Sequence, residues 1–146
     1  MSARLNEQDI AEIGEVCPRL YAAVGWSDGK EPDWSAFRDC CHPEILLVPM
    51  GSGAPTPTGL EPFIAGMEGQ RRSGAVKELR EIEVGRSVSG YGNLASVRSS
   101  FLATIDGQER RGVTFAQLVR HEGRWRIIAT AWENERDDEP LPDEFA

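Results

Sequence analysis

The chain has 146 residues, of which 40% are hydrophobic and 27% are charged, proportions that are typical of a globular domain with a single core. Its formal net charge of −8 argues against nucleic-acid binding, because such proteins need basic surface to meet phosphates. No apolar run approaches the roughly 18 residues of a membrane span, and no signal-peptide pattern opens the chain, so we predict a cytoplasmic protein that does not engage membranes.

The three cysteines, Cys17, Cys40 and Cys41, predict neither a disulfide framework nor a metal centre. Two adjacent cysteines form a disulfide only with strain. A zinc site needs ligands spaced to converge on a tetrahedron, and the sequence CCH at residues 40–42 has no second ligand pair to complete one. We therefore expect small buried side chains at a helix end, no metal, and no other cofactor.

The first part of the chain has a helical pattern. Over residues 6–24 apolar residues recur every three or four positions, which predicts an amphipathic helix, and Pro18 within it predicts a kink or the start of a second segment. Asp33 has the chemistry of an N-cap for a short second helix. That helix is expected to end at His42, because the residue before a proline is pushed out of the helical region.

A strand and a third helix follow. Residues 44–50, EILLVPM, are typical of a short buried strand. After a loop, Thr58 and Glu61 have the spacing of a capping box, which predicts a helix whose buried face includes Phe63 and Met67.

After Gly74 the pattern changes to strands. We predict one long strand or two over residues 76–89, and further strands over 94–105, 108–120 and 125–133. The pairs Asp106-Gly107 and Glu122-Gly123 are typical of two-residue hairpin turns. Helices followed by an antiparallel sheet indicate an α+β fold. We predict a single domain over residues 1–136 and an acidic, proline-containing tail over 137–146.

The two turns fix which side chains share a face, provided that no bulge intervenes. The inner face then consists of Val97, Ser99, Phe101, Thr114, Ala116, Leu118, Ile127, Ala129, Ala131 and Glu133. The side chains become small toward Ala131, which predicts a pocket there. The outer face then consists of Val113, Phe115, Ile128, Thr130 and Trp132. This face is too apolar for solvent, so we expect a homodimer that covers it.

At this point the chain resembles the nuclear-transport-factor-2-like superfamily, which includes SnoaL-like and ketosteroid-isomerase-like proteins. The matching segments are DWSAFRDCCHPEILLVP, TGLEPF and GRWRIIATAW, and the resemblance spans residues 9–135. It implies N-terminal helices packed in the concave face of a curved, mainly antiparallel sheet, with a pocket at the open end. The superfamily contains isomerases, dehydratases, cyclases and epoxide hydrolases as well as non-enzymatic binding and assembly domains, so the resemblance indicates a fold more than a function. The closing segment resembles an uncharacterised bacterial subgroup.

The sequence departs from the better-known polar pockets of that superfamily. Many relatives carry histidine at the positions matching Ala129 and Ala131. The ketosteroid-isomerase type needs a carboxylate base together with a tyrosine and a protonated acid, and only Tyr21, on the first helix, is placed to point inward. Arg98, the nearest match to an epoxide-hydrolase arginine, is predicted to face outward.

Two residues are candidate general bases. Glu133 would stand at the pocket end of the last strand near Ser99, Thr114 and Tyr21, where desolvation would raise its pKa toward the working pH. The alternative is a strand-end glutamate that begins the acidic tail. His42 is a candidate at the pocket rim, and its alternative is a hydrogen-bonded or solvated histidine at a helix end.

The remaining candidates are pocket-lining residues, for which ordinary core packing is the alternative. They are Tyr21, Trp26, Trp34, Phe37, Met50, Phe63, Met67, Val97, Ser99, Phe101, Thr114, Ala116, Ala129 and Ala131. The sequence thus favours a small-molecule-binding domain with an apolar pocket. An enzyme of lyase, isomerase or hydrolase type that uses Glu133 or His42 is the first alternative, and a non-enzymatic assembly domain is the second.

Overall fold

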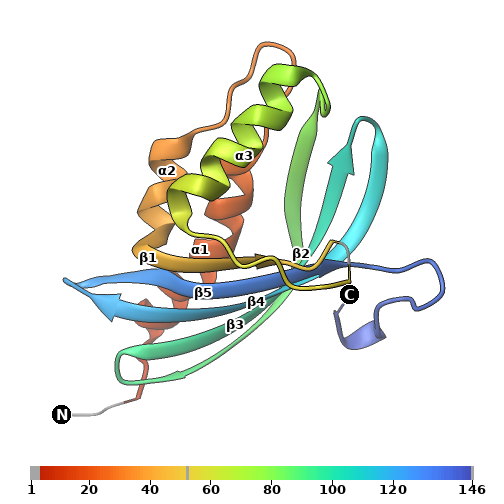
Figure 1. The fold of residues 1–146 in the computed structure, drawn as a ribbon. Helices are drawn as coiled ribbons and strands as arrows, with labels where there is room; N and C mark the ends of the chain where they lie inside the picture. The colour runs from red at the N-terminus through yellow and green to blue at the C-terminus, as the bar shows by residue number, and fades with distance from the viewer. Residues whose placement is uncertain (1–3, 52, 146) are drawn as a thin grey trace.

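Three helices lean against one curved sheet in the computed structural model, which describes residues 4–51 and 53–145 (Figure 1). The helices are α1 (Glu7–Val24), α2 (Trp34–Cys40) and α3 (Leu60–Ser73), and the strands are β1 (Cys41–Pro49), β2 (Leu79–Tyr91), β3 (Leu94–Ile105), β4 (Gln108–His121) and β5 (Arg124–Asn134). The strand order is β1-β5-β4-β3-β2, with β1 parallel to β5 and all other pairs antiparallel. The predicted α+β class is confirmed.

Helix α1 runs without interruption through Pro18. A proline has no N–H to donate to the carbonyl four residues earlier, which leaves the oxygen of Gly14 free. The Arg86 guanidinium of β2 donates to that oxygen. A side chain of the sheet thus replaces the missing helical hydrogen bond, and the helix needs no second segment at this point.

A capping box at the start of α1 also ties the helix to the sheet. Asn6 Oδ1 accepts from the backbone N–H of Asp9 at 2.8 Å. The Asp9 carboxylate accepts in turn from Arg120 at 2.9 Å and from the indole N–H of Trp125 at 3.1 Å. The Trp125 hydrogen bond is the foremost cause that lowers the pKa of Asp9. One buried carboxylate therefore anchors the first turn of α1 to β4 and β5.

The second helix begins as predicted and the third does not. Asp33 Oδ1 accepts from the backbone N–H of Ala36 at 3.0 Å, which confirms the N-cap. At α3 the predicted capping box is wrong, because Gly59 is the N-cap and makes no side-chain hydrogen bond. Thr58 instead pairs through its backbone with Leu47 of β1, and Glu61 forms an ion pair with Arg38 at 2.8 Å.

Both predicted hairpin turns are confirmed. Asp106 and Gly107 have φ angles of 49° and 84°, and Glu122 and Gly123 have 55° and 77°. Positive φ at both central residues is the signature of the type I′ turn, whose twist matches that of the strands it joins.

A bulge overturns the predicted register of the last strand. Leu118 pairs with Ile127, but Gln117 pairs with Ala129, so Ile128 has no partner on β4. From that point every side chain of β5 changes face. Thr130 and Trp132 point inward, whereas Ala129, Ala131 and Glu133 point outward. The bulge buries an indole that the unbulged register would leave on the outer surface, and Trp132 packs edge-on against Phe63 of α3 at 5.8 Å between ring centroids.

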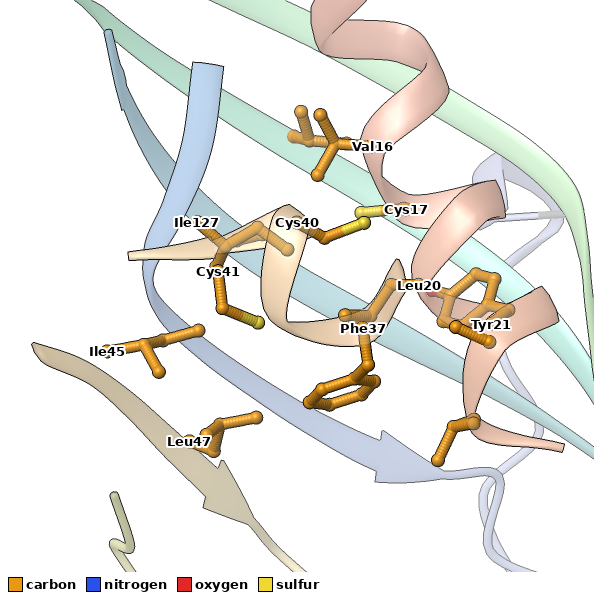
Figure 2. Packing of buried hydrophobic residues seen from close by; sticks show 14 of the residues in the cluster. Val16, Cys17, Leu20, Tyr21, Phe37, Cys40, Cys41, Ile45, Leu47 and Ile127 are labelled. Carbon is orange, nitrogen blue, oxygen red and sulfur yellow. The ribbon is translucent and has the colours of Figure 1, made fainter. Parts of the chain in front are cut away.

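The core lies between α1, α2 and the inner face of the sheet (Figure 2). Ile13, Phe37, Leu47 and Ile127 are each at most 2% exposed. The three cysteines are free and buried, and burial raises the pKa of the Cys17 and Cys41 thiols to about 12. They are therefore neutral packing groups rather than nucleophiles.

The C-terminal tail returns to the outer face of the sheet. It ends in a single 3₁₀ turn, Asp143–Phe145. The Phe145 ring meets that of Phe115 edge-on at 6.3 Å between centroids, and the Arg98 guanidinium stacks over Phe145 at 4.5 Å. Phe145 thus contacts the body, and the acidic residues Asp137 and Glu144 lie 3.7 Å from Arg110 and 3.9 Å from Arg98. Across the two described ranges no helix has the length and hydrophobicity needed to cross a membrane, and the cytoplasmic location stays a prediction.

Candidate functional site

A cavity of about 520 Å³ lies between the helices and the inner face of the sheet. Its lining is mainly apolar and aromatic, with a few polar groups from four elements and the loop before α3. The lining residues are Leu20, Tyr21, Val24, Trp26, Phe37, Leu47, Pro49, Thr56, Thr58, Pro62, Phe63, Gly66, Met67, Gln70, Val76, Leu79, Glu81, Phe101, Ala103, Ile105, Thr114, Thr130, Trp132 and Asn134. Thr56, Gln70 and Asn134 are exposed and mark the mouth.

The structure brings half of the sequence-predicted pocket residues together at this cavity. Those that line it are Tyr21, Trp26, Phe37, Phe63, Met67, Phe101 and Thr114. Trp34 lies behind the wall, edge-on to Phe37 at 5.3 Å, and donates its indole N–H to Glu68. Met50 does not line the cavity, and its backbone N–H donates to the Trp132 carbonyl.

The other predicted lining residues lie elsewhere for two reasons. Val97, Ser99 and Ala116 face inward but are each at most 2% exposed, buried within the packed core rather than lining the cavity. Ala129 and Ala131 face outward because of the bulge at Ile128, and the prediction that they line the pocket is wrong. Thr130 and Trp132, predicted for the outer face, occupy the inner wall in their place.

Neither predicted base lies at the cavity. Glu133 faces outward with its side chain 42% exposed, at 3.9 Å from Arg136, so a role for it across the cavity is excluded. His42 lies in β1, where its Nδ1 accepts from the backbone N–H of Glu44 at 3.0 Å. Its ring lies 5.8 Å from that of His121 beside the hairpin turn, away from the lining residues. An enzyme built on Glu133 or His42 is therefore not supported.

The acidic group of the cavity is Glu81 of β2. Its side chain lines the wall next to Ala103, its partner on β3. Among the described residues none forms a hydrogen bond or ion pair with it. Desolvation by the apolar surroundings raises the pKa of Glu81 from 4.5 to about 7. A carboxyl that is half ionised near neutral pH is matched to proton transfer or to ligand binding.

A chain of hydroxyl groups runs from the cavity wall into the sheet. Tyr21 Oη lies 3.0 Å from Ser99 Oγ and 2.9 Å from Thr114 Oγ1. Ser99 Oγ donates to Glu83 Oε2 at 2.7 Å, and Glu83 forms an ion pair with Arg86 at 3.0 Å. Burial is the largest cause that raises the pKa of Tyr21 above its usual range. The phenol therefore stays neutral at all physiological pH values.

Over the described residues no cluster of three or more His, Cys, Asp and Glu side chains could hold a metal ion. Within residues 4–51 and 53–145, no lysine, arginine or histidine lines the cavity, so these residues offer no positive charge to an anionic group there.

Comparison with solved structures gives the fold. A protein of unknown function with a cystatin-like fold from Nostoc punctiforme superposes with a TM-score of 0.72 at 14% identity, covering 92% of this chain and 96% of its own. A nuclear-transport-factor-2-like protein of unknown function from Silicibacter pomeroyi gives 0.63 at 20% identity, with 88% and 97% covered. A nuclear-transport-factor-2-like protein from Cytophaga hutchinsonii gives 0.66 at 16% identity, with 89% and 99% covered.

The chain has the nuclear-transport-factor-2-like fold. The resemblance seen in the sequence is thereby confirmed at the level of the fold. A scan against protein-family models finds no match, and no curated protein sequence matches.

Within this nuclear-transport-factor-2-like fold, sequence reasoning missed Glu81. In the alternation of β2, Glu81 and Glu83 share one face, but nothing local in the sequence indicates that this face is the inner one. Hydrophobicity alone predicts that Ile82 and Val84 point inward, yet both are more than 40% exposed on the outer face. Extending the regular pairing with β3 from the turn at Gly92 would pair Glu81 with Thr104 on the outer face. A bulge between Glu83 and Gly85 shifts the register by one residue, so that Glu81 pairs with Ala103 and both glutamates face inward.

Proposed function

We propose that the protein binds a small, mostly apolar organic molecule in the cavity between the helices and the sheet. The observation that carries the proposal is a cavity of about 520 Å³ whose aromatic and aliphatic wall holds a carboxyl without a partner among the described residues. Cavities of this size and character are typical of ligand sites, and an unpaired carboxyl in apolar surroundings is unfavourable unless a ligand or water satisfies it.

Gly66 and Gly69 of α3 provide a matched pair of variants to test this. Gly66 lines the cavity and Gly69 does not. A Cβ added at either position meets no atom within 4 Å, so both tolerate a large side chain. Gly66→Trp is expected to fill the mouth and abolish binding, whereas Gly69→Trp should leave it unchanged. Native mass spectrometry of the purified protein and thermal shifts with a library of aromatic fragments measure the difference. Equal binding by the two variants would refute the proposal.

A second candidate function is acid–base catalysis with Glu81 as the general base. It is favoured by the pKa of about 7 for this carboxyl, which faces an apolar cavity. A benzisoxazole probe tests it, because the base takes the ring C–H proton while the N–O bond breaks to give a cyanophenolate. We expect a rate that rises with pH through about 7, as Glu81 ionises, and that is lost in Glu81→Gln and in Gly66→Trp. A rate that both variants retain would exclude Glu81 as the base.

We further propose a homodimer that buries the outer face of the sheet. Phe115, Leu46 and Ile82 are 52%, 46% and 42% exposed there, and the corrected register adds Ala129 and Ala131 in place of Thr130 and Trp132. Phe115→Glu is expected to give a monomer in sedimentation, whereas Ile10→Glu, at a residue of α1 that is 48% exposed and does not belong to the sheet, should remain dimeric. A wild-type protein that sediments as a monomer would refute the proposed dimer.

A further inference from the structure

We infer that the inner end of the cavity selects an apolar amine, bound as its ammonium ion, over carbonyl and carboxylate ligands of the same shape. The inference rests on the proposed binding function and specifies the ligand class. It follows from the order of protons along the hydroxyl chain and from the charges that face the cavity.

The order of protons is fixed at the buried end of the chain. Glu83 forms an ion pair with Arg86, and the Ser99 hydroxyl donates its single proton to Glu83 Oε2 at 2.7 Å. Ser99 Oγ then has only lone pairs for Tyr21, and the phenol donates its single proton to Ser99 at 3.0 Å.

The positions of these protons also determine which hydrogen-bonding group is available to a ligand in the cavity. Because the Tyr21 proton is committed to Ser99, the Thr114 hydroxyl, 2.9 Å from Tyr21 Oη, donates to the phenol oxygen. Thr114, which lines the cavity, then has only the lone pairs of Oγ1 left for a ligand. A carbonyl or carboxylate ligand placed there meets an acceptor and finds no proton.

The charges of the lining favour the same ligand class. Glu81 is the acidic group of the wall, and Tyr21 is the only other titratable lining residue in the described ranges. Arg110 shares the inner face of the sheet two strands away, but it is exposed and lies 3.7 Å from Asp137 of the tail. An ammonium ion would pair with the Glu81 carboxylate, which has no partner among the described residues. Charge-assisted hydrogen bonds are roughly twice as strong as neutral ones.

Four probes that share one naphthalene body test the inference by calorimetry: naphthylmethylamine, naphthylmethanol, acetonaphthone and naphthoate. The amine is expected to bind at least about tenfold more tightly than the ketone or the carboxylate, with the alcohol between them. Its affinity should fall about tenfold per pH unit below about pH 7, because Glu81 must lose its proton to pair with the cation. Glu81→Gln should weaken the amine about tenfold or more and leave the ketone unchanged.

Glu83→Gln tests the proton order separately. The new amide can donate to Ser99, which releases the Ser99 proton to Tyr21, the Tyr21 proton to Thr114 and the Thr114 proton to the cavity. The ketone is then expected to gain several-fold in affinity, and thermal unfolding shows whether the variant is folded. Ketone binding equal to that of the amine in the wild-type protein would overturn the inference and leave the binding function intact. Absence of binding by all four probes, and of any co-purified molecule, would overturn both.

Discussion

Replacing Glu81 by glutamine should stabilise the folded protein, and only above mildly acidic pH. The folded-state pKa is about 7 and the ordinary value is 4.5. At a pH below 4.5 the carboxyl is neutral in both the folded and the unfolded chain, so it makes no difference to the free energy of unfolding. As the pH rises from there to about 7, the unfolded chain ionises while the folded chain holds its proton. The unfolded chain therefore gains stability relative to the folded one.

The size of the effect follows from the width of that interval. Each pH unit between the two pKa values is worth about 1.4 kcal/mol, so the interval from 4.5 to about 7 corresponds to about 3 kcal/mol. This is an upper limit, because the carboxyl faces a cavity that water can enter. Glutamine has the same shape and no charge, and it removes the penalty at every pH.

Urea denaturation of the wild-type protein and Glu81→Gln at about pH 4.5 and about pH 8 measures the difference. We expect equal free energies of unfolding at the lower pH, and a variant more stable by about 2–3 kcal/mol at the higher pH. Glu109→Gln, at an exposed position of β4, serves as the matched control and should change stability little at either pH. If Glu81→Gln raised the free energy of unfolding at the higher pH by no more than Glu109→Gln does, the desolvation of the Glu81 carboxyl would be refuted.

Three further predictions test the fold around the site. Thr130→Asp should destabilise the protein by more than about 2 kcal/mol in urea denaturation, because it buries a carboxylate in the core, whereas Ala131→Asp, on the outer face of the sheet, should cost less; the reverse ranking would restore the unbulged register. Arg86→Met should cost about 1–3 kcal/mol by leaving a helical carbonyl unsatisfied, and adding Pro18→Ala should recover part of it by supplying an N–H; purely additive effects would contradict this. Asp9→Asn should lower the melting temperature most at neutral pH and progressively less as the pH falls through the depressed pKa of Asp9. A difference in melting temperature that is constant with pH would argue against the ionised Asp9 as the anchor of α1.

Local chemistry made most of the elements predictable. The cap at Asp33 and the two type I′ turns depend on residues within three or four positions of one another, and all appear where the sequence placed them. The predicted capping box at Thr58 does not form, because the backbone of Thr58 pairs with that of Leu47, a residue outside the local segment. Helix α1 continues through Pro18 because the guanidinium of Arg86, which is distant in sequence, donates to the Gly14 carbonyl in place of the N–H that proline lacks. Both predictions were wrong for the same reason. In each case a residue that is distant in sequence makes the hydrogen bonds that decide the local structure.

The candidate site shows the same division. The turn at Glu122-Gly123, the pairing of Leu118 with Ile127 and the inward placement of Phe101 and Thr114 follow from a period of two and the length of the turns. The single unpaired residue Ile128 then reverses the face of everything after it. No local signal marks that bulge, because it is stabilised by burying Trp132 against Phe63 of a distant helix.

By itself, then, the sequence determined the α+β class, the helix and strand order, the turn types and a mainly apolar inner face. Only the tertiary structure decided which acid the cavity holds, because that depends on strand register and on the packing of helices over the sheet. It moved the candidate carboxyl from Glu133, which is outside and solvated, to Glu81, which is inside and without a partner among the described residues. Hydrophobic pattern indicates that each strand has a buried face, but a one-residue shift in pairing, in β2 as in β5, decides which side chains that face carries.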